Sequence, residues 1–367
     1  MRITELTLHN FRNFEHQVFR PGPGVNLICG KNAQGKTSLL EAVYILCCAR
    51  SFRQGRERDW VRFGAPAARV QLQFETRRGD ESLELRVAEG GARKEILLNG
   101  QPIRRNGELA TRFCTVLFEP GHLNLVKEGP EERRRFLDTA IGQLRPKYQN
   151  VLEDYGRVVA QKNMLLRQGG AQEQLGIWNE RLAALGSYLS FMRFSYVQKL
   201  SVQSGLHHER LSKGAESLSL EYQTFCGRPE AGQMEDLGQI KDALERELWD
   251  ALPLETARSV SLVGPHRDDV ELLIDGRSAR LFGSQGQQRS VALSLKLGEC
   301  ALVEETVGEP PILLLDDVFS ELDRSRQQYV RSRLRERQTL ITTCALPRPS
   351  KTAAVFRLEQ GEITALS

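Results

Sequence analysis

Residues Gly30–Thr37 read GKNAQGKT, which fits the phosphate-loop pattern G-x-x-x-x-G-K-[ST] at every position. Glycines let backbone N–H groups approach a polyphosphate closely, while the lysine supplies a cation for its β- and γ-oxygens. The pattern therefore assigns Lys36 to the phosphates, as a catalytic group, and the Thr37 hydroxyl to Mg²⁺. The residues predicted to bind nucleotide here are Gly30, Lys31, Asn32, Ala33, Gln34, Gly35, Lys36, Thr37 and Ser38.

The flanking residues supply the setting that this loop requires. Val25–Cys29 (VNLIC) has the composition of a short buried strand, and Thr37–Ala49 places apolar residues on one helical stripe. A strand, a glycine loop and a helix in this order hold phosphates at a helix N-terminus, and they predict an α/β fold. The alternative is a chance match in a glycine-containing turn.

Size and composition narrow the class of protein. A chain of 367 residues is long for one domain, and a net charge of +4 permits nucleic-acid contact without arguing for it. The seven cysteines contain no C-x-x-C pair and favour reduced thiols in a cytosol. We find neither a signal peptide nor an apolar run long enough to span a bilayer. The expected location is therefore the cytoplasm, without a membrane partner.

A second signal follows far along the chain, in ILLLDDVFSELD (Ile312–Asp323). Four apolar residues that end in a carboxylate predict a buried parallel strand, with the acid at the edge where phosphate ligands bind. We expect Asp316 to bind Mg²⁺ and Asp317 to orient or deprotonate an attacking water. The alternative is that the two acids only end a strand.

A third and weaker signal is the loop LFGSQGQQRS (Leu281–Ser290), which precedes an apolar helix, Val291–Val303. A serine and glycines at a helix N-terminus can bind an anion. Because one phosphate loop already exists, we expect Ser284, Gly286 and Gln287 to contact the nucleotide of a second subunit. A surface turn that starts a helix is the alternative.

The remaining chain alternates between sheet and helix. Residues 60–118 read as antiparallel sheet with a hairpin at Asn99-Gly100, whereas residues 131–168 and 173–213 read as two long helical stretches. No heptad pattern is long enough for a coiled-coil arm. Further predictions are strands at Ile3–His9 and Leu218–Tyr222, helices at residues 233–252 and Arg324–Arg337, a hairpin at Asp275-Gly276, and a surface pair at His207-His208.

These motifs together resemble the heads of ABC-type ATPases, in particular the SMC-like repair ATPases. Within that group the chain resembles the RecF family of bacterial recombination mediators along nearly its whole length. The more specific matching pieces are LHNFRN (Leu8–Asn13), SLLEAVYIL (Ser38–Leu46), RRRFLD (Arg133–Asp138), GPHRDD (Gly264–Asp269), FGSQGQQRS and LLLDDVFSELD.

The resemblance implies an ABC-type head, a mixed sheet around the phosphate-loop helix, formed by residues 1–120 and 255–367. A mostly helical subdomain of residues 121–254 would be inserted, without a long coiled-coil arm. It also implies ATP and Mg²⁺ as cofactors and an ATP-dependent homodimer with Ser284 and Gly286 acting in trans. DNA at single-strand gaps and duplex junctions, together with RecR and RecO, are the implied partners in loading RecA. ATP hydrolysis would be weak and stimulated by DNA, and it would reset the dimer, which acts as a clamp on DNA.

The chain departs from the ABC pattern, and two of the departures, a missing histidine and an aspartate, Asp317, at the usual glutamate position, argue for slow turnover. Leu117–Leu123 has Glu119 and His122 but no glutamine, and Thr342-Thr343-Cys344 stands where many heads carry a histidine. The competing classes are a transporter ATPase subunit, an ATPase fused to a nuclease, and a purely structural SMC-like DNA tether. The arginine-rich stretches at Arg50–Arg62 and Arg324–Arg337 are candidate DNA-binding surfaces. The first could instead face the phosphates of a nucleotide, and a solvated loop also explains it.

Overall fold

The computed structural model describes residues 1–88, 94–224, 227–229, 232–334, 337–344 and 353–366. The chain forms two compact units, one of Met1–Leu123 with Glu299–Ser367 and the other of Asn124–Gly298. This division places residues 255–298, which we assigned from the sequence to the ATPase head, with the helical residues instead. The physical reason is that a strand at residues 269–274 pairs with one at residues 218–223.

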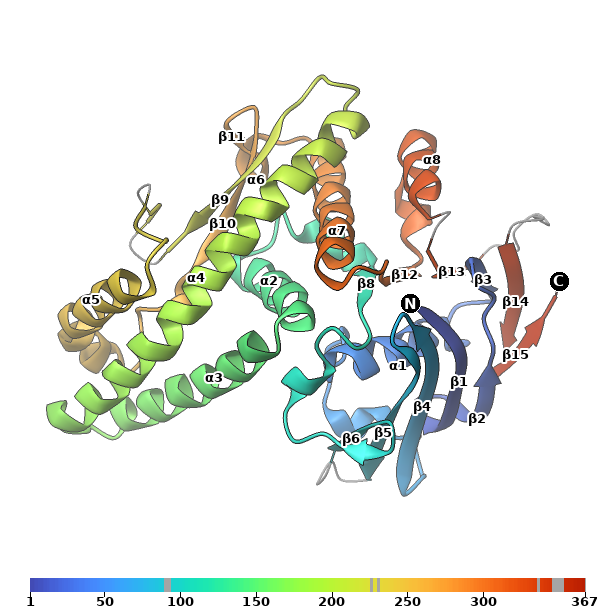
Figure 1. The fold of residues 1–367 in the computed structure, drawn as a ribbon, viewed down its shortest axis with the longest axis horizontal. Coiled ribbons are helices and arrows are strands. Elements are labelled where there is room, and N and C mark those ends of the chain that lie inside the picture. The colour runs from blue at the N-terminus through green and yellow to red at the C-terminus, as the bar shows by residue number, and fades with distance from the viewer. Residues whose placement is uncertain (89–93, 225–226, 230–231, 335–336, 345–352, 367) are drawn as a thin grey trace. The chain divides into compact units, whose positions relative to one another are not determined.

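Two sheets build the first unit (Figure 1). The first is antiparallel with the order β2-β1-β4-β5-β6-β7, and the second has the order β15-β14-β3-β13-β12-β8 with parallel pairing from β14 to β8. The elements are β1 (Arg2–Phe11), β2 (Phe14–Phe19), β3 (Val25–Cys29), α1 (Lys36–Cys48), η1 (Glu57–Trp60), β4 (Ala67–Thr76), β5 (Gly79–Ala88), β6 (Lys94–Leu98), β7 (Gln101–Pro102), η2 (Asn106–Leu109), β8 (Thr115–Phe118), β12 (Ile312–Asp316), η5 (Val318–Glu321), α8 (Arg324–Arg333), β13 (Thr339–Thr343), β14 (Ala353–Glu359) and β15 (Glu362–Ala365).

The helix α1 is the centre of this unit. It contacts β4 and β5 of the antiparallel sheet as well as β12 and β13 of the parallel one. Its side chains from Leu39 to Cys47 are buried, as expected of a helix that has apolar neighbours all round. The central strand β12 is likewise buried at all four apolar positions, whereas β4 alternates between exposed and buried residues because one of its faces is solvated.

Helices dominate the second unit, and a three-stranded sheet of order β11-β10-β9 completes it. The helices α3 and α4 lie side by side (Figure 1). The elements are η3 (Pro120–Asn124) at the boundary, α2 (Pro130–Leu144), α3 (Pro146–Arg167), α4 (Gln172–Leu211), β9 (Leu218–Gln223), α5 (Leu237–Arg258), η4 (Pro265–Arg267), β10 (Asp269–Ile274), β11 (Arg277–Ser278), α6 (Ala279–Phe282) and α7 (Gln285–Val307), the last of which continues into the first unit.

The segment Gly264–Asp269 joins the helices of this unit to its sheet. The Asp268 carboxylate is completely buried and accepts a hydrogen bond from the Tyr222 hydroxyl of β9. The guanidinium of Arg133 on α2 donates to both carboxylate oxygens of Asp269, at 2.7 and 2.9 Å. Paired, hydrogen-bonded charges of this kind stabilise one arrangement of the surrounding helices, because a partner left alone would stay buried and unpaired.

The structure corrects three expectations drawn from the sequence. The stretch 131–168 is two helices, since Pro146 begins α3 and the preceding Arg145 is extended. Residues 60–118 are not wholly antiparallel sheet, because β8 pairs in parallel with β12. The pair His207-His208 is not a surface pair: His208 is buried, and its Nε2 lies 3.0 Å from the carboxylate of Glu216. In the described part of the chain, no helix has the length and apolarity needed to cross a membrane.

Candidate nucleotide-binding site

The phosphate loop leaves the parallel sheet between two strands that come from the end of the chain. Strand β3 pairs with β13 on one side and β14 on the other, and the loop joins β3 to α1. A Cβ on Gly30 would lie 2.3 Å from the carbonyl oxygen of Leu358, and one on Gly35, which has φ of +106°, would lie 2.4 Å from Asn13 Nδ2. Both positions therefore require glycine, for close approach in the first case and for the left-handed backbone in the second.

The ammonium group of Lys36 is folded into the loop. Its Nζ donates to the carbonyl oxygens of Gly30 at 2.6 Å and Lys31 at 2.9 Å, and it lies 3.7 Å from the Sγ of Cys344. The Sγ in turn lies 2.9 Å from the amide oxygen of Asn32. These contacts hold a positive charge at the start of α1, where the helix N-terminus already favours an anion.

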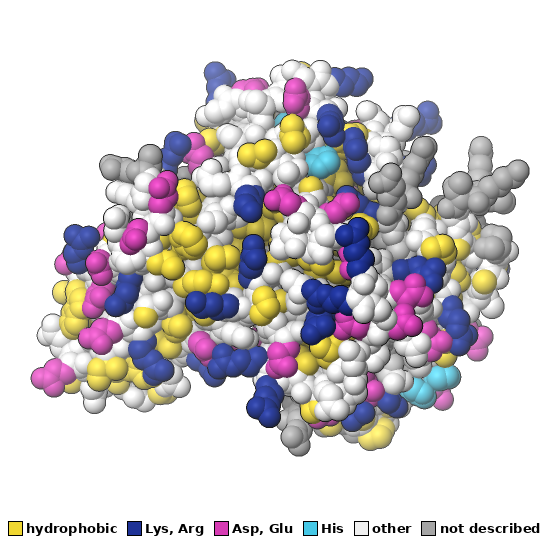
Figure 2. All heavy atoms as spheres, in the orientation of Figure 1, with side chains coloured by type: hydrophobic (Ala, Val, Ile, Leu, Met, Phe, Trp, Pro, Cys, Tyr) yellow, Lys and Arg dark blue, Asp and Glu magenta, His cyan; other side chains and the backbone are white. Residues whose placement is uncertain are grey.

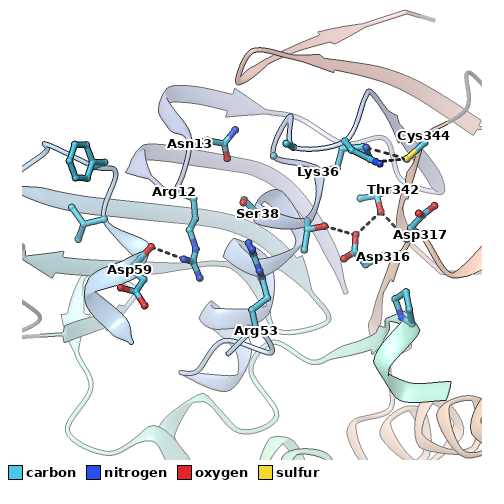
Figure 3. Close-up of a pocket in the computed structure, with 17 residues that line it drawn as sticks. Arg12, Asn13, Lys36, Ser38, Arg53, Asp59, Asp316, Asp317, Thr342 and Cys344 are labelled. Carbon is cyan, nitrogen blue, oxygen red and sulfur yellow. Dashed lines mark hydrogen bonds between the residues drawn. The ribbon is translucent and has the colours of Figure 1, made fainter. Parts of the chain in front are cut away.

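The Thr37 hydroxyl of α1 lies within hydrogen-bond distance of the Asp316 carboxylate of β12. The Oγ1 of Thr37 donates to Asp316 Oδ1 at 3.0 Å, and the Oγ1 of Thr342 donates to the same oxygen at 2.7 Å (Figure 3). The three groups come from α1, β12 and β13, which are remote in sequence. They present oxygen atoms only, which is the donor chemistry that Mg²⁺ prefers.

The next residue, Asp317, has a strained backbone. Its φ is +50° and ψ is 22°, a left-handed conformation that few non-glycine residues adopt, and its N–H donates to Thr342 Oγ1 at 3.0 Å. Burial raises the pKa of the Asp317 carboxyl, an effect that the charge of Lys36 partly offsets and that of Asp316 reinforces. Such a carboxyl is a better proton acceptor than an ordinary surface aspartate.

These side chains line one cavity of about 630 Å³, a size typical of small-molecule sites. Figure 3 shows Lys36, Asp316, Asp317, Thr342 and Cys344 at one end of it, with Arg12 and Asp59 at the other. The structure thus brings Asp316 and Asp317 together with most of the predicted loop residues. The predicted residues that line the cavity are Asn32, Ala33, Gly35, Lys36, Thr37, Ser38, Asp316 and Asp317. Gly30 and Lys31 contribute through their carbonyl groups to Lys36, and the Gln34 carbonyl accepts from Asn13 Nδ2 at 2.9 Å.

Two arginines of this cavity were not among the predicted site residues. Arg12, in the turn after β1, donates from Nε and Nη2 to the carboxylate of Glu41 at 3.0 and 2.6 Å, and Arg53 approaches the same carboxylate at 3.4 Å. Glu41 lies on α1, three residues after Ser38, and its side chain is completely buried. The one carboxylate therefore orients two guanidinium groups beside the phosphate loop. The fragment LHNFRN held the signal for Arg12, but its role is visible only once Glu41 is placed.

The loop of Ser284, Gly286 and Gln287 lies in the second unit, and its own hydrogen bonds are local. The Ser284 N–H donates to Gln287 Oε1 at 2.7 Å while the Gln287 N–H donates to Ser284 Oγ at 3.2 Å. This is a reciprocal capping box at the start of α7. The Nε2 of Gln287 also donates to the carboxylate of Glu216 at 2.9 Å. The cap accounts for the helix start, and a contact with a second subunit's nucleotide stays a prediction.

The chain is similar to known proteins over nearly its whole length. The family model described as RecF/RecN/SMC N terminal domain matches residues 2–362. A protein of Symbiobacterium thermophilum named DNA replication and repair protein RecF is 41% identical over 345 residues, which cover 94% of this chain and 91% of that protein. A protein of the same name from Alkaliphilus oremlandii is 36% identical over 368 residues, covering 99% of this chain and 100% of its own.

Solved structures agree with the sequence comparison. A structure described as the recombination mediator protein RecF with ATP in the RecFOR pathway has a TM-score of 0.92 and 33% identity, covering 100% of this chain and 98% of its own. The Smc head bound to the C-winged helix domain of ScpA has a TM-score of 0.56 at 16% identity, with coverage of 100% and 98%, and it supports the fold alone. The predicted ABC-type ATPase head is thereby confirmed, and among the described residues the longest helix is α4, with 40 residues, so no long coiled-coil arm is present there. On this evidence the chain belongs to the RecF family.

Proposed function

We propose that the protein is an ATP-dependent DNA-binding protein of recombinational repair and replication, which hydrolyses ATP slowly. The observation that carries the proposal is the convergence of Lys36, Thr37 and Asp316 on one cavity, with 3.0 Å between the hydroxyl and the carboxylate. Phosphoryl transfer requires a cation beside the β- and γ-phosphates, here Lys36. It also requires oxygen ligands for Mg²⁺, here Thr37 and Asp316. The relatives named RecF supply the biological setting.

The donor set fits Mg²⁺. Thr37 and Asp316 would hold the ion, and few protein ligands suffice because Mg²⁺ in such sites keeps waters and phosphate oxygens. When bound, the ion supplies positive charge to the phosphates.

Slow hydrolysis follows from the groups that this chain supplies. Asp317, with its raised pKa, orients a water and accepts its proton, while Lys36 stabilises negative charge on the phosphates. The region expected to replace the ABC glutamine holds Glu119, whose N–H donates to His122 Nδ1 at 3.3 Å, and Thr342 is already engaged by Asp316. Without the usual glutamine and histidine, the water is positioned by fewer groups, which suits a timed switch better than a motor.

ATP is proposed to drive dimerisation. In a head-to-head dimer, Ser284 and Gly286 of one copy would contact the γ-phosphate held by Lys36 of the other, so that two identical surfaces enclose two nucleotides. Each ATP then adds contacts that exist only in the dimer and shifts the equilibrium toward it. Hydrolysis removes the γ-phosphate, weakens these contacts and resets the clamp.

For DNA binding, both the loop after α1 and α8 offer exposed arginines. In the loop, Arg56 and Arg58 are exposed, whereas Arg53 approaches the buried Glu41. On α8, Arg331 and Arg333 are exposed and lie over aromatic rings. Figure 2 shows Lys and Arg side chains interspersed with Asp and Glu on the face in view, so that face carries no uninterrupted basic patch. DNA, single-stranded at gaps or duplex at junctions, would thus bind through a few exposed arginines.

The proposed biological role follows the family. One relative is described within the RecFOR pathway. We therefore place RecR and RecO as partners in the cytoplasm, with loading of RecA at single-strand gaps as the outcome. DNA that binds the ATP-bound dimer would stimulate its weak ATPase activity.

The test combines nucleotide binding with DNA binding. Lys36→Ala is expected to abolish useful ATP affinity, because the phosphates lose their cation, and thereby to abolish ATP-dependent DNA binding. Lys199→Ala, an exposed lysine of α4, is the matched control and should behave as the parent does. Titration with a fluorescent ATP analogue and with a gapped duplex measures both effects. Parental ATP affinity in Lys36→Ala would falsify the assignment of the loop.

A further inference from the structure

The side chain of Glu216 joins a buried histidine to the loop before α7, residues 283–287. Its Oε2 lies 3.0 Å from Nε2 of His208, and its Oε1 accepts from Nε2 of Gln287 at 2.9 Å. The side chain of His208, on α4, is completely buried, whereas that of Glu216 is 24% exposed. One carboxylate therefore links the interior of the second unit with the loop that we assigned to the nucleotide of a second copy.

This carboxylate decides how the amide of Gln287 is oriented. A carboxylate only accepts hydrogen bonds, so the amide must present its Nε2 to Glu216. Its Oε1 then faces the other way, where it accepts from the Ser284 N–H at 2.7 Å. With the amide reversed, oxygen would face oxygen and two donors would face each other, so both contacts would be lost. Glu216 thus fixes the half of the capping box that depends on the Gln287 side chain.

His208 holds the carboxylate from its other side. Burial lowers the pKa of this imidazole, and the Glu216 carboxylate offsets that effect only in part, so the ring is neutral. A neutral ring donates only from the nitrogen that carries its proton, which places that proton on Nε2. Because a closely packed interior leaves a buried ring little room to turn, Nε2 is a fixed donor for Glu216.

The backbone on both sides of Glu216 is fixed as well. The Oγ of Ser212, just after α4, lies 3.3 Å from both the nitrogen and the carbonyl oxygen of Glu216. The N–H and the hydroxyl of Ser217 both donate to Asp275 Oδ1, at 2.8 and 2.9 Å. Asp275 belongs to the hairpin between β10 and β11. The Glu216 side chain therefore extends from a backbone that two other elements hold in place.

We propose that Glu216, supported by His208, is a positioning residue for the loop before α7. It keeps Ser284 in the arrangement that contacts the γ-phosphate bound by a second copy, and Gln287 transmits this effect because both ends of its amide are engaged within the unit. This role rests on the ATP-driven dimer proposed above. A loop that adopts the competent arrangement only part of the time binds its partner more weakly by that fraction.

The experiment compares the parent with Glu216→Ala and Glu216→Gln. Alanine removes both contacts of the carboxylate. Glutamine keeps an acceptor for Gln287 and offers a donor to His208, whose Nε2 can accept once the ring proton moves to Nδ1. The conservative variant should therefore restore the behaviour of the parent, which a loss of charge alone would not allow.

Glu221→Ala is the matched control. The Glu221 side chain, on β9 of the same unit, is 26% exposed and lies 2.8 Å from the guanidinium of Arg228. This variant thus removes a carboxylate of similar exposure that also has a charged partner. Amide hydrogen exchange of residues 281–290 is measured without nucleotide, and dimerisation is measured by sedimentation equilibrium with a non-hydrolysable ATP analogue.

Glu216→Ala should speed the exchange of residues 281–290 roughly tenfold, because the loss of a hydrogen bond to a charged group shifts a local equilibrium by about that factor. Since a two-fold dimer uses the loop twice, its dissociation constant should rise roughly a hundredfold. The affinity of the monomer for ATP should not change, because Lys36 and Thr37 are untouched. Glu216→Gln and Glu221→Ala should keep the parental exchange and dimerisation.

Four results overturn the positioning role. They are parental exchange of residues 281–290 in Glu216→Ala, faster exchange with parental dimerisation, equal effects of alanine and glutamine, and a general acceleration across the unit that Glu221→Ala shares. If Glu216→Ala does not fold, Gln287→Leu breaks the same contact from the loop, and parental exchange in that variant overturns the role too. If the parent forms no dimer with the analogue, the proposed dimer is wrong, while the exchange data still decide whether Glu216 positions the loop.

Discussion

Acidification should destabilise the second unit through His266. Burial lowers the pKa of this imidazole to about 4, and its ring accepts and donates as a neutral group. The Tyr155 hydroxyl lies 2.8 Å from Nδ1, and the Ser261 carbonyl lies 3.3 Å from Nε2. In the unfolded chain the same imidazole has its ordinary pKa of about 6.5. Between these two pKa values the unfolded state binds more protons than the folded state. The stability contributed by neutral His266 is therefore fully present above pH 6.5 and is lost as the pH falls toward 4.

The magnitude follows from the two pKa values. With about 4 in the folded state and 6.5 in the unfolded state, linkage gives a loss of about 2 kcal/mol between pH 7 and pH 5. Replacement by glutamine keeps a donor and an acceptor but removes the titration. We therefore expect His266→Gln to be less stable at pH 7 and to lose about 2 kcal/mol less than the parent on acidification to pH 5.

Urea unfolding followed by tryptophan emission measures this difference, since two of the three tryptophans, Trp178 and Trp249, lie in the second unit. The parent, His266→Gln and His16→Gln, which removes an exposed histidine of β2, are compared at both pH values. Subtracting variant from parent removes the shared contribution of other groups, including His208, whose pKa burial also lowers. The reasoning would be refuted if the free energy of unfolding fell equally between pH 7 and pH 5 in the parent and in His266→Gln. It would also be refuted if His16→Gln lost as little stability over this range as His266→Gln.

Three further changes probe the nucleotide site and the loop before α7. Asp317→Asn should keep ATP binding but slow hydrolysis, because the amide holds a water yet is a poor base, and a parental single-turnover rate would contradict this role. Ser284→Arg should bind ATP normally but form no ATP-induced dimer, with about 1 kcal/mol lost with the helix cap; sedimentation with a non-hydrolysable analogue and a thermal melt separate the two effects. Glu41→Gln should weaken ATP binding and cost roughly 1–3 kcal/mol of stability, since both Arg12 and Arg53 lose a charged partner, and unchanged nucleotide titration would remove their assigned role.

Local signals predicted the elements around the phosphate loop well. The expected strand Val25–Cys29 is β3, and the expected helix Thr37–Ala49 differs from α1 by one residue at each end. The strand before Asp316 was likewise recognisable, because a run of four apolar residues that ends in a carboxylate is typical of a central strand in a parallel sheet. Each of these features is encoded within about a dozen consecutive residues.

Features that depend on remote partners were not predictable. The arginine-rich stretch predicted a surface facing the phosphates of DNA or of a nucleotide. It did not predict that Arg53 approaches Glu41, because a charge pattern does not reveal which carboxylate will be buried nearby. His208 was expected at the surface, and only the fold of β9 against α4 shows that it is enclosed and paired with Glu216. The left-handed backbone of Asp317 was not predicted either, although aspartate adopts this conformation more often than most non-glycine residues.

The strand order of the first unit determines when the sheet around the phosphate loop can form during translation. Both neighbours of β3 in its sheet, β13 and β14, lie after residue 338. The side chain of Gln338 also bonds the backbone of Ile3 at 2.6 and 3.0 Å. The second unit, by contrast, is one continuous stretch, Asn124–Gly298, and can fold as soon as it emerges. The phosphate loop therefore lacks both neighbouring strands of its sheet until residues 339–359 have been synthesised, and the cavity around it, which includes Thr342, is incomplete until then.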